Sequence, residues 1–125
     1  MNALETRVIE LLDRRRELFN ARADVIDEIG RINSVFLKTQ SFDSLQKAIE
    51  YDNNRRVGKN RVKQLSALCD SYDKEMSTIE EEIMAILTFD GHIILNLRSG
   101  DIVYTVSLHD RNMEIRWFRK STSPA

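Results

Sequence analysis

The fold is decided where the chain reads LTFDGHIILNLRSGDIVYTVSLHDRNMEIRWFRK, residues 87–120. Apolar residues occupy every second position from His92 to Lys120, an alternation that places one face of a β-strand in a core. Between Leu4 and Leu87 they recur every three or four positions instead, which is typical of amphipathic helices. The sequence therefore predicts an α+β protein, in which long N-terminal helices, arranged as a helical hairpin or coiled coil, precede a three-stranded antiparallel β-meander.

Three strands are expected, over residues 92–98, 101–109 and 112–119. Ser99-Gly100 and Asp110-Arg111 are predicted to form two-residue turns between them. One face is then almost wholly apolar, and Leu95, Tyr104 and Trp117 form one row across it. The opposite face is expected to hold two mixed rows: Asn96, Val103 and Phe118, then Ile94, Thr105 and Arg116. A bulge at Asn112 would turn the last strand over and send Arg116 inward, so this alternative stays open.

The first helix is expected to carry a heptad seam from Leu4 to Phe36. Arg15 and Arg22 occupy seam positions, and Arg15 is expected to pair with a glutamate of a partner helix. The apolar faces of two such helices exceed what a small sheet can cover, which favours a homo-oligomer, most simply a C2 dimer. A monomeric hairpin folded over the sheet is the alternative.

A second seam runs from Val62 to Ile86, and Ser41 or Asp43 is expected to cap the helical segment before it. Residues 51–60 lack an apolar stripe, so they form either a break or an exposed helical stretch. The single cysteine, Cys69, lies in the second seam and is interpreted as a packed thiol. A reducing cytoplasm is the expected location.

We expect one domain over residues 1–125, made of a helical oligomerisation arm (1–87), a meander that carries a ligand-binding face (88–120) and a flexible tail (121–125). The net charge is −1 overall. The formal charge is −3 over residues 1–90 and +2 over residues 91–125. This balance disfavours a nucleic-acid polymer as partner and suits a small anionic ligand. No apolar run is long enough to predict a membrane span.

Catalytic signatures are absent from the sequence, so no enzyme activity, cofactor or metal site is expected. His92 and His109 have no ligand-like spacing, and the four glycines are too scattered for a phosphate-binding loop. The acidic residues 80–82 are interpreted as a solvated helix face.

A binding face is the stronger candidate, because an amide, a hydroxyl, a guanidinium and an aromatic ring share one expected sheet surface: Asn96, Thr105, Arg116 and Phe118. This set suits a nucleotide, whose base can stack on the ring and whose phosphate can pair with the arginine. Further candidate ligand contacts are Phe89, Arg98, Lys120, Arg55 and Arg56. The alternative is that Phe118 packs under a helix, that Arg116 is solvated, and that residues 55–63 form a solvated basic helix.

Three segments resemble the phage anti-Thoeris nucleotide-sponge family: FLKTQSFDSL (36–45), AIEYDNNRR (48–56) and LTFDG (87–91). The resemblance implies non-catalytic sequestration of a cyclic ADP-ribose isomer in the host-cell cytoplasm, and in some members of cyclic oligonucleotides, by a homo-oligomer. It also implies a pocket built from an aromatic residue, an asparagine and basic residues, with a partner subunit contributing. Phe89 matches the aromatic position, Asn96 the asparagine, and Arg116 and Lys120 the basic positions, although Lys120 departs from arginine. A helical module that docks on a host protein is the alternative function.

Overall fold

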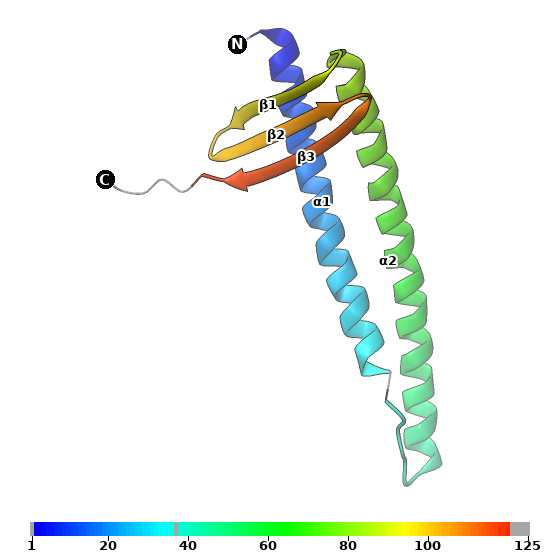
Figure 1. The fold of residues 1–125 in the computed structure, drawn as a ribbon. Helices are drawn as coiled ribbons and strands as arrows, with labels where there is room; N and C mark the ends of the chain where they lie inside the picture. Colours follow the sequence, from blue (N-terminus) through cyan, green and yellow to red (C-terminus); the bar gives the residue numbers. More distant parts are fainter. Residues whose placement is uncertain (1, 37, 121–125) are drawn as a thin grey trace, which may run out of the picture. The chain divides into compact units, whose positions relative to one another are not determined.

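The computed structural model describes residues 2–36 and 38–120, which form two helices followed by three strands (Figure 1). These elements are α1 (Ala3–Val35), α2 (Leu45–Ile86), β1 (His92–Ser99), β2 (Ile102–His109) and β3 (Asn112–Arg119). The strands form one antiparallel sheet in the order β1-β2-β3. The predicted α+β class, with a β-meander after two long helices, is confirmed. The tail expected over residues 121–125 lies outside the described residues.

The chain divides into two compact units, and each helix contributes to both. One unit comprises Met1–Glu17 and Met76–Ala125, and therefore contains the sheet together with the beginning of α1 and the end of α2. The other comprises Leu18–Glu75, which is the rest of the two helices and their connection. The candidate binding face lies in the first of these, which we name the sheet unit, and the second is named the hairpin unit.

The core of the sheet unit lies on the apolar face of the meander. The central strand, β2, has four inward side chains that are at most 5% exposed: Ile102, Tyr104, Val106 and Leu108. Val8 and Leu12 of α1 and Ile83 of α2 are equally buried within the same unit. The alternation thus produces one buried and one open face, because consecutive side chains of a strand point in opposite directions.

The register between β2 and β3 is the predicted one, since Tyr104 pairs with Trp117. Asp110 and Arg111 form the two-residue turn between these strands, with positive φ angles of 44° and 73°. There is no bulge at Asn112, which pairs with His109. The alternative in which β3 turns over is therefore excluded.

The predicted register between β1 and β2 is wrong by two residues. Ser99 pairs with Ile102, so the turn is Gly100-Asp101 and not Ser99-Gly100. Gly100 has a φ of +61° at the first turn position, where a type II′ turn favours glycine. A shift of two residues keeps every side chain on its predicted face but changes its neighbours across the sheet. Leu95 consequently lies opposite Val106, and Asn96 lies opposite Thr105.

The helices pack along the predicted seams. In the hairpin unit, Val25, Leu65 and Cys69 form a buried cluster, which confirms the packed thiol. The expectation that Arg15 pairs with a glutamate of a partner helix is confirmed. Its Nε lies 2.9 Å from Oε1 of Glu80, on α2 of the same chain.

The second helix runs without a break from Leu45 to Ile86, so residues 51–60 are helical. Its cap is Ser44 and not Ser41 or Asp43, because Ser44 Oγ accepts a hydrogen bond from the backbone N–H of Lys47 at 3.2 Å. Asp52 pairs with Arg56 at 3.1 Å, one turn further along the helix. Such pairs support a helical stretch that has little apolar surface to bury.

Candidate functional site

The candidate site is the open face of the sheet, which is opposite to the core. Its side chains alternate with the buried ones and form four rows across β1, β2 and β3. In order along the sheet these rows are His92-His109-Asn112, Ile94-Ser107-Glu114, Asn96-Thr105-Arg116 and Arg98-Val103-Phe118. The third and fourth rows contain five of the candidate residues together with Val103, and we refer to these two rows as the open-face site.

The third row brings together the amide, the hydroxyl and the guanidinium. Thr105 Oγ1 donates a hydrogen bond to Asn96 Oδ1 at 3.1 Å, which leaves the Asn96 amide nitrogen as a donor. Arg116 Nε donates to Oε1 of Glu114 at 2.8 Å, along the same strand. With strands about 4.8 Å apart, the row from Asn96 to Arg116 spans about 10 Å. The corrected register therefore places Asn96 beside Thr105 and Arg116, whereas the sequence predicted it in the row of Phe118.

The fourth row supplies an aromatic surface. Phe118 is 56% exposed and lies opposite Val103, on the side of the sheet away from the core. The interpretation in which Phe118 packs under a helix is therefore wrong. Arg98, at the other end of the row, donates from Nε to the carbonyl oxygen of Gly100 at 3.0 Å. Because Phe118 follows Arg116 by two residues, their Cα atoms are about 7 Å apart along the strand.

Sequence reasoning missed the histidine pair at the opposite end of the open face. The rings of His92 and His109 lie with their centroids 4.1 Å apart. The signal was present, because the correct register places these residues directly opposite each other. The two-residue error in the predicted register separated them.

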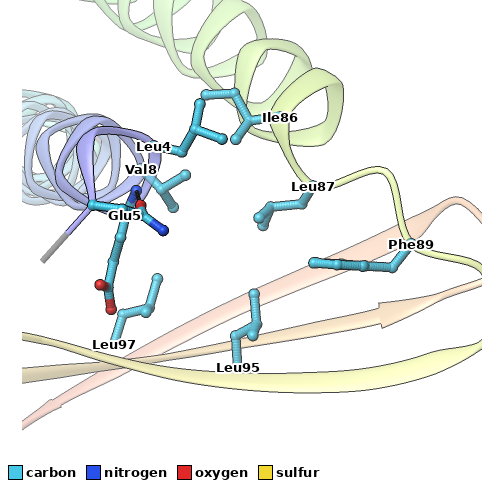
Figure 2. A pocket seen from close by; sticks show the side chains of 9 residues that line it. Leu4, Glu5, Val8, Ile86, Leu87, Phe89, Leu95 and Leu97 are labelled. Atoms are coloured by element: carbon cyan, nitrogen blue, oxygen red, sulfur yellow. Dashed lines mark hydrogen bonds between the residues drawn. The ribbon is translucent and has the colours of Figure 1, made fainter.

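Phe89 does not share the open face with Phe118. Its side chain points into an apolar cavity of about 390 Å³ in the sheet unit (Figure 2). The cavity is lined by Asn2, Leu4, Glu5, Val8, Ile86, Leu87, Phe89, Leu95 and Leu97. Leu95 and Leu97 belong to the half-buried face of β1, so this cavity and the open-face site are on opposite sides of the sheet.

The remaining candidates are also not part of the open-face site. Arg55 and Arg56 belong to the hairpin unit, where both pair with Asp52, at 3.3 and 3.1 Å. Lys120 follows β3 as an exposed residue, and its backbone N–H donates to the carbonyl oxygen of Asp101 at 2.7 Å.

A polar network on the core side holds the sheet against α1. Tyr104 donates its hydroxyl proton to Asp13 Oδ1 at 2.5 Å, and Ser99 Oγ donates to Asp13 Oδ2 at 2.7 Å. Arg16 Nε donates to the Tyr104 oxygen at 2.9 Å. Burial, followed by the hydrogen bond to Asp13, raises the pKa of Tyr104 to about 12. The network fixes β2, and β2 in turn carries Thr105 at the centre of the open-face site.

Across residues 2–36 and 38–120, no group of three or more His, Cys, Asp or Glu side chains could hold a metal ion. No helix among these residues is long and apolar enough to cross a membrane. The side chains of the open-face site offer amide and guanidinium donors, a hydroxyl and an aromatic ring. Chemically, this arrangement can bind a planar ring next to an anionic group.

Comparisons of the chain with models of known families, with curated proteins and with solved structures gave no match.

Proposed function

We propose that this protein binds a small anionic nucleotide on the open face of its sheet and sequesters it without cleaving it. The observation that carries the proposal is the third row, in which Asn96, Thr105 and Arg116 are aligned beside the exposed ring of Phe118. In this arrangement the base stacks on Phe118 and Arg116 pairs with a phosphate. The Asn96 amide then donates to the base or the ribose.

The ion pair between Arg116 and Glu114 does not prevent phosphate binding. Their side chains are 77% and 61% exposed, and exposed ion pairs contribute only about 0.2–1 kcal/mol. A charge-assisted hydrogen bond to a phosphate is worth about 1.5–3 kcal/mol. Exchanging Glu114 for a phosphate therefore costs Arg116 little.

Sequestration requires an affinity that keeps a scarce signal below the threshold of its effector. Nanomolar binding corresponds to about −12 kcal/mol. Stacking provides about 1–3 kcal/mol per base, and each phosphate contact provides about 1.5–3 kcal/mol, so nanomolar binding requires several such contacts at once. The hydrogen bond between Thr105 and Asn96 supports this affinity, because it orients the amide before the ligand arrives.

The resemblance to the anti-Thoeris sponge family names the ligand class: a cyclic ADP-ribose isomer or a cyclic oligonucleotide. Under this proposal the protein acts in the cytoplasm of the infected host cell as a homo-oligomer, and the defence effector remains inactive because its signal is bound. The open-face site lacks Phe89, Lys120, Arg55 and Arg56. We therefore assign ligand binding to Asn96, Arg98, Thr105, Arg116 and Phe118.

Isothermal titration calorimetry with cyclic ADP-ribose isomers and cyclic di- and trinucleotides tests the proposal. Phe118→Ala removes the stacking surface and should weaken binding by about 5- to 150-fold. Arg116→Gln removes the phosphate contact and should weaken it by about 10- to 150-fold. Arg61→Gln is the matched control, since it removes an exposed, paired arginine from the hairpin unit and should leave binding unchanged.

Recovery of the intact ligand after heat denaturation distinguishes sequestration from hydrolysis. Folded wild-type protein that binds none of these nucleotides would refute the proposal. Equal losses in Phe118→Ala and Arg61→Gln would refute the assigned site.

Exposed apolar side chains in the hairpin unit favour a second candidate function, docking on another protein. Ile26, Val57 and Leu68 are 43%, 69% and 38% exposed. If docking is the function, Val57→Asp should abolish capture of a host protein, whereas Phe118→Ala should not affect it. Nucleotide binding that Phe118→Ala weakens and Val57→Asp leaves unchanged would support the nucleotide site instead.

A further inference from the structure

We propose that His92 and His109 bind one divalent transition-metal ion, such as zinc, at the opposite end of the open face from the open-face site. The two residues lie directly opposite each other on β1 and β2, and their ring centroids are 4.1 Å apart. Imidazole is the commonest metal-binding side chain in proteins, and it suits zinc, copper and nickel. This inference goes beyond the nucleotide proposal and does not depend on it.

The strand register brings the two imidazoles as close together as a sheet allows. The two-residue turn Gly100-Asp101 makes Ser99 and Ile102 a hydrogen-bonded pair. Hydrogen-bonded and non-hydrogen-bonded pairs alternate along an antiparallel ladder, so His92 and His109, seven positions further from the turn, form a non-hydrogen-bonded pair. In such a pair the Cα atoms are only about 4.5 Å apart, and the side chains are closer than in the other kind of pair.

The geometry of the two rings fits a shared ion. Zinc–nitrogen distances are about 2.0–2.1 Å, so two nitrogens that bind the same ion lie no more than about 4 Å apart. Two imidazoles with their centroids 4.1 Å apart reach this spacing by small rotations of the side chains. The side chain of His109 is 57% exposed, so an ion can reach it from solvent.

Two carboxylates next to the histidine pair favour a cation there. Asp110 Oδ2 lies 3.6 Å from His109 Nε2. Asp90, His109 and Asp110 line one cavity of about 240 Å³ in the sheet unit. Arg111 also lines this cavity, so two negative charges face one positive charge. The excess of negative charge attracts a divalent cation.

The proposed site is a chelate of two histidines and not a closed protein cage. A closed site uses at least three protein ligands, and residues 2–36 and 38–120 contain no such group. Water or another external ligand therefore completes the coordination of the ion. An ion held by His92 and His109 also ties the edge strand β1 to the central strand β2, so binding should raise the melting temperature.

Isothermal titration calorimetry of the untagged full-length chain with Zn²⁺ tests the site without any nucleotide. A pH of about 7.5 is suitable, because only neutral imidazole binds a metal. The chain has two histidines in all. We expect one ion per chain, and His92→Asn and His109→Asn should each weaken binding by about tenfold or more, because one imidazole forms no chelate. Asn112→Ala is the matched control, since it removes an exposed neighbour of His109 in the same row and should leave binding unchanged.

Magnesium distinguishes chelation by imidazole from attraction to the carboxylates. Mg²⁺ prefers oxygen ligands, so it should neither bind the pair nor raise the melting temperature. Zn²⁺ should raise the melting temperature of the wild-type protein and shift the side-chain nuclear magnetic resonance signals of both histidines.

A wild-type protein that does not bind Zn²⁺ overturns the proposal. Binding of wild-type strength in either histidine variant also overturns it, as does equal binding of Mg²⁺ or an equal loss in Asn112→Ala. Thermal denaturation without metal identifies any variant that is unfolded. The signals of the two imidazoles in the wild-type protein then decide, and Zn²⁺ binding that leaves either signal unchanged contradicts the shared site.

Discussion

The hydroxyl group of Tyr104 is expected to stabilise the sheet unit strongly, and Tyr104→Phe measures its contribution. The side chain is fully buried, and its oxygen makes two hydrogen bonds with charged groups, to Asp13 at 2.5 Å and from Arg16 at 2.9 Å. Hydrogen bonds to charged groups contribute about 1.5–3 kcal/mol each. The variant loses both bonds but keeps the ring.

The expected loss is about 2 kcal/mol and not the sum of the two bonds. Asp13 and Arg16 are 32% and 22% exposed, so water partly replaces the lost hydroxyl. Asp13 also keeps the hydrogen bond from Ser99. In a chain of this size, 2 kcal/mol lowers the melting temperature by about 6–10 °C.

Urea denaturation followed by tryptophan fluorescence is the assay, because the single tryptophan, Trp117, lies in β3. Tyr51→Phe is the matched control, since its ring packs against Phe36 and Phe42 in the hairpin unit. Tyr51→Phe should lower the free energy of unfolding by less than about 0.5 kcal/mol. A loss in Tyr104→Phe no larger than that of the control contradicts the inferred role of the network.

Three further predictions concern stability. Gly30→Ala should stabilise the protein by about 0.5–1 kcal/mol in thermal denaturation, because a Cβ at residue 30 meets no atom within 4 Å. Gly58→Ala should destabilise the protein by about 1 kcal/mol, because a Cβ at residue 58 would lie 2.8 Å from the Phe36 ring. An equal effect of both substitutions would contradict the described packing. Arg111→Gly should raise the free energy of unfolding by about 0.5–1 kcal/mol in urea denaturation, because glycine removes the strain of a φ of 73°. A lower free energy of unfolding would contradict the turn geometry. The free energy of unfolding should fall as the pH rises from about 10 towards 12, since the folded state holds the Tyr104 proton more tightly than the unfolded state does. Tyr104→Phe should show a smaller fall across this range, and identical slopes would contradict the raised pKa.

Much of the fold was predictable because it rests on periodicity. The change from a helical to an alternating pattern near residue 90 gave the class, the order of the elements and the face on which each strand residue lies. Asp110-Arg111 was recognisable as a turn because only a two-residue loop leaves the apolar face of β3 uncharged until Arg119.

The rows of the candidate site were less predictable. Gly100 is compatible with two turns, Ser99-Gly100 and Gly100-Asp101, and both keep the same faces of β1 and β2. The preference of a type II′ turn for glycine at its first position favours the observed turn. When this glycine preference is not applied, Asn96 is assigned to the wrong row, and the contact between His92 and His109 is missed.

Side-chain partners depend on tertiary packing and were beyond the sequence pattern. A heptad position identifies Arg15 as a seam residue, but it does not say whether Glu80 of the same chain or a residue of another chain meets it. The position of Phe89 before β1 likewise does not say on which side of the sheet its ring lies. The structure places it in the apolar cavity behind β1.

The most direct test of the central claim is nuclear magnetic resonance of the ¹⁵N-labelled protein during titration with cyclic ADP-ribose isomers and cyclic oligonucleotides. We predict chemical-shift changes concentrated at the amides of Asn96, Thr105, Arg116 and Phe118, with residues 18–75 unchanged. Shifts confined to the hairpin unit, or none with any of these nucleotides, would contradict the proposed nucleotide site.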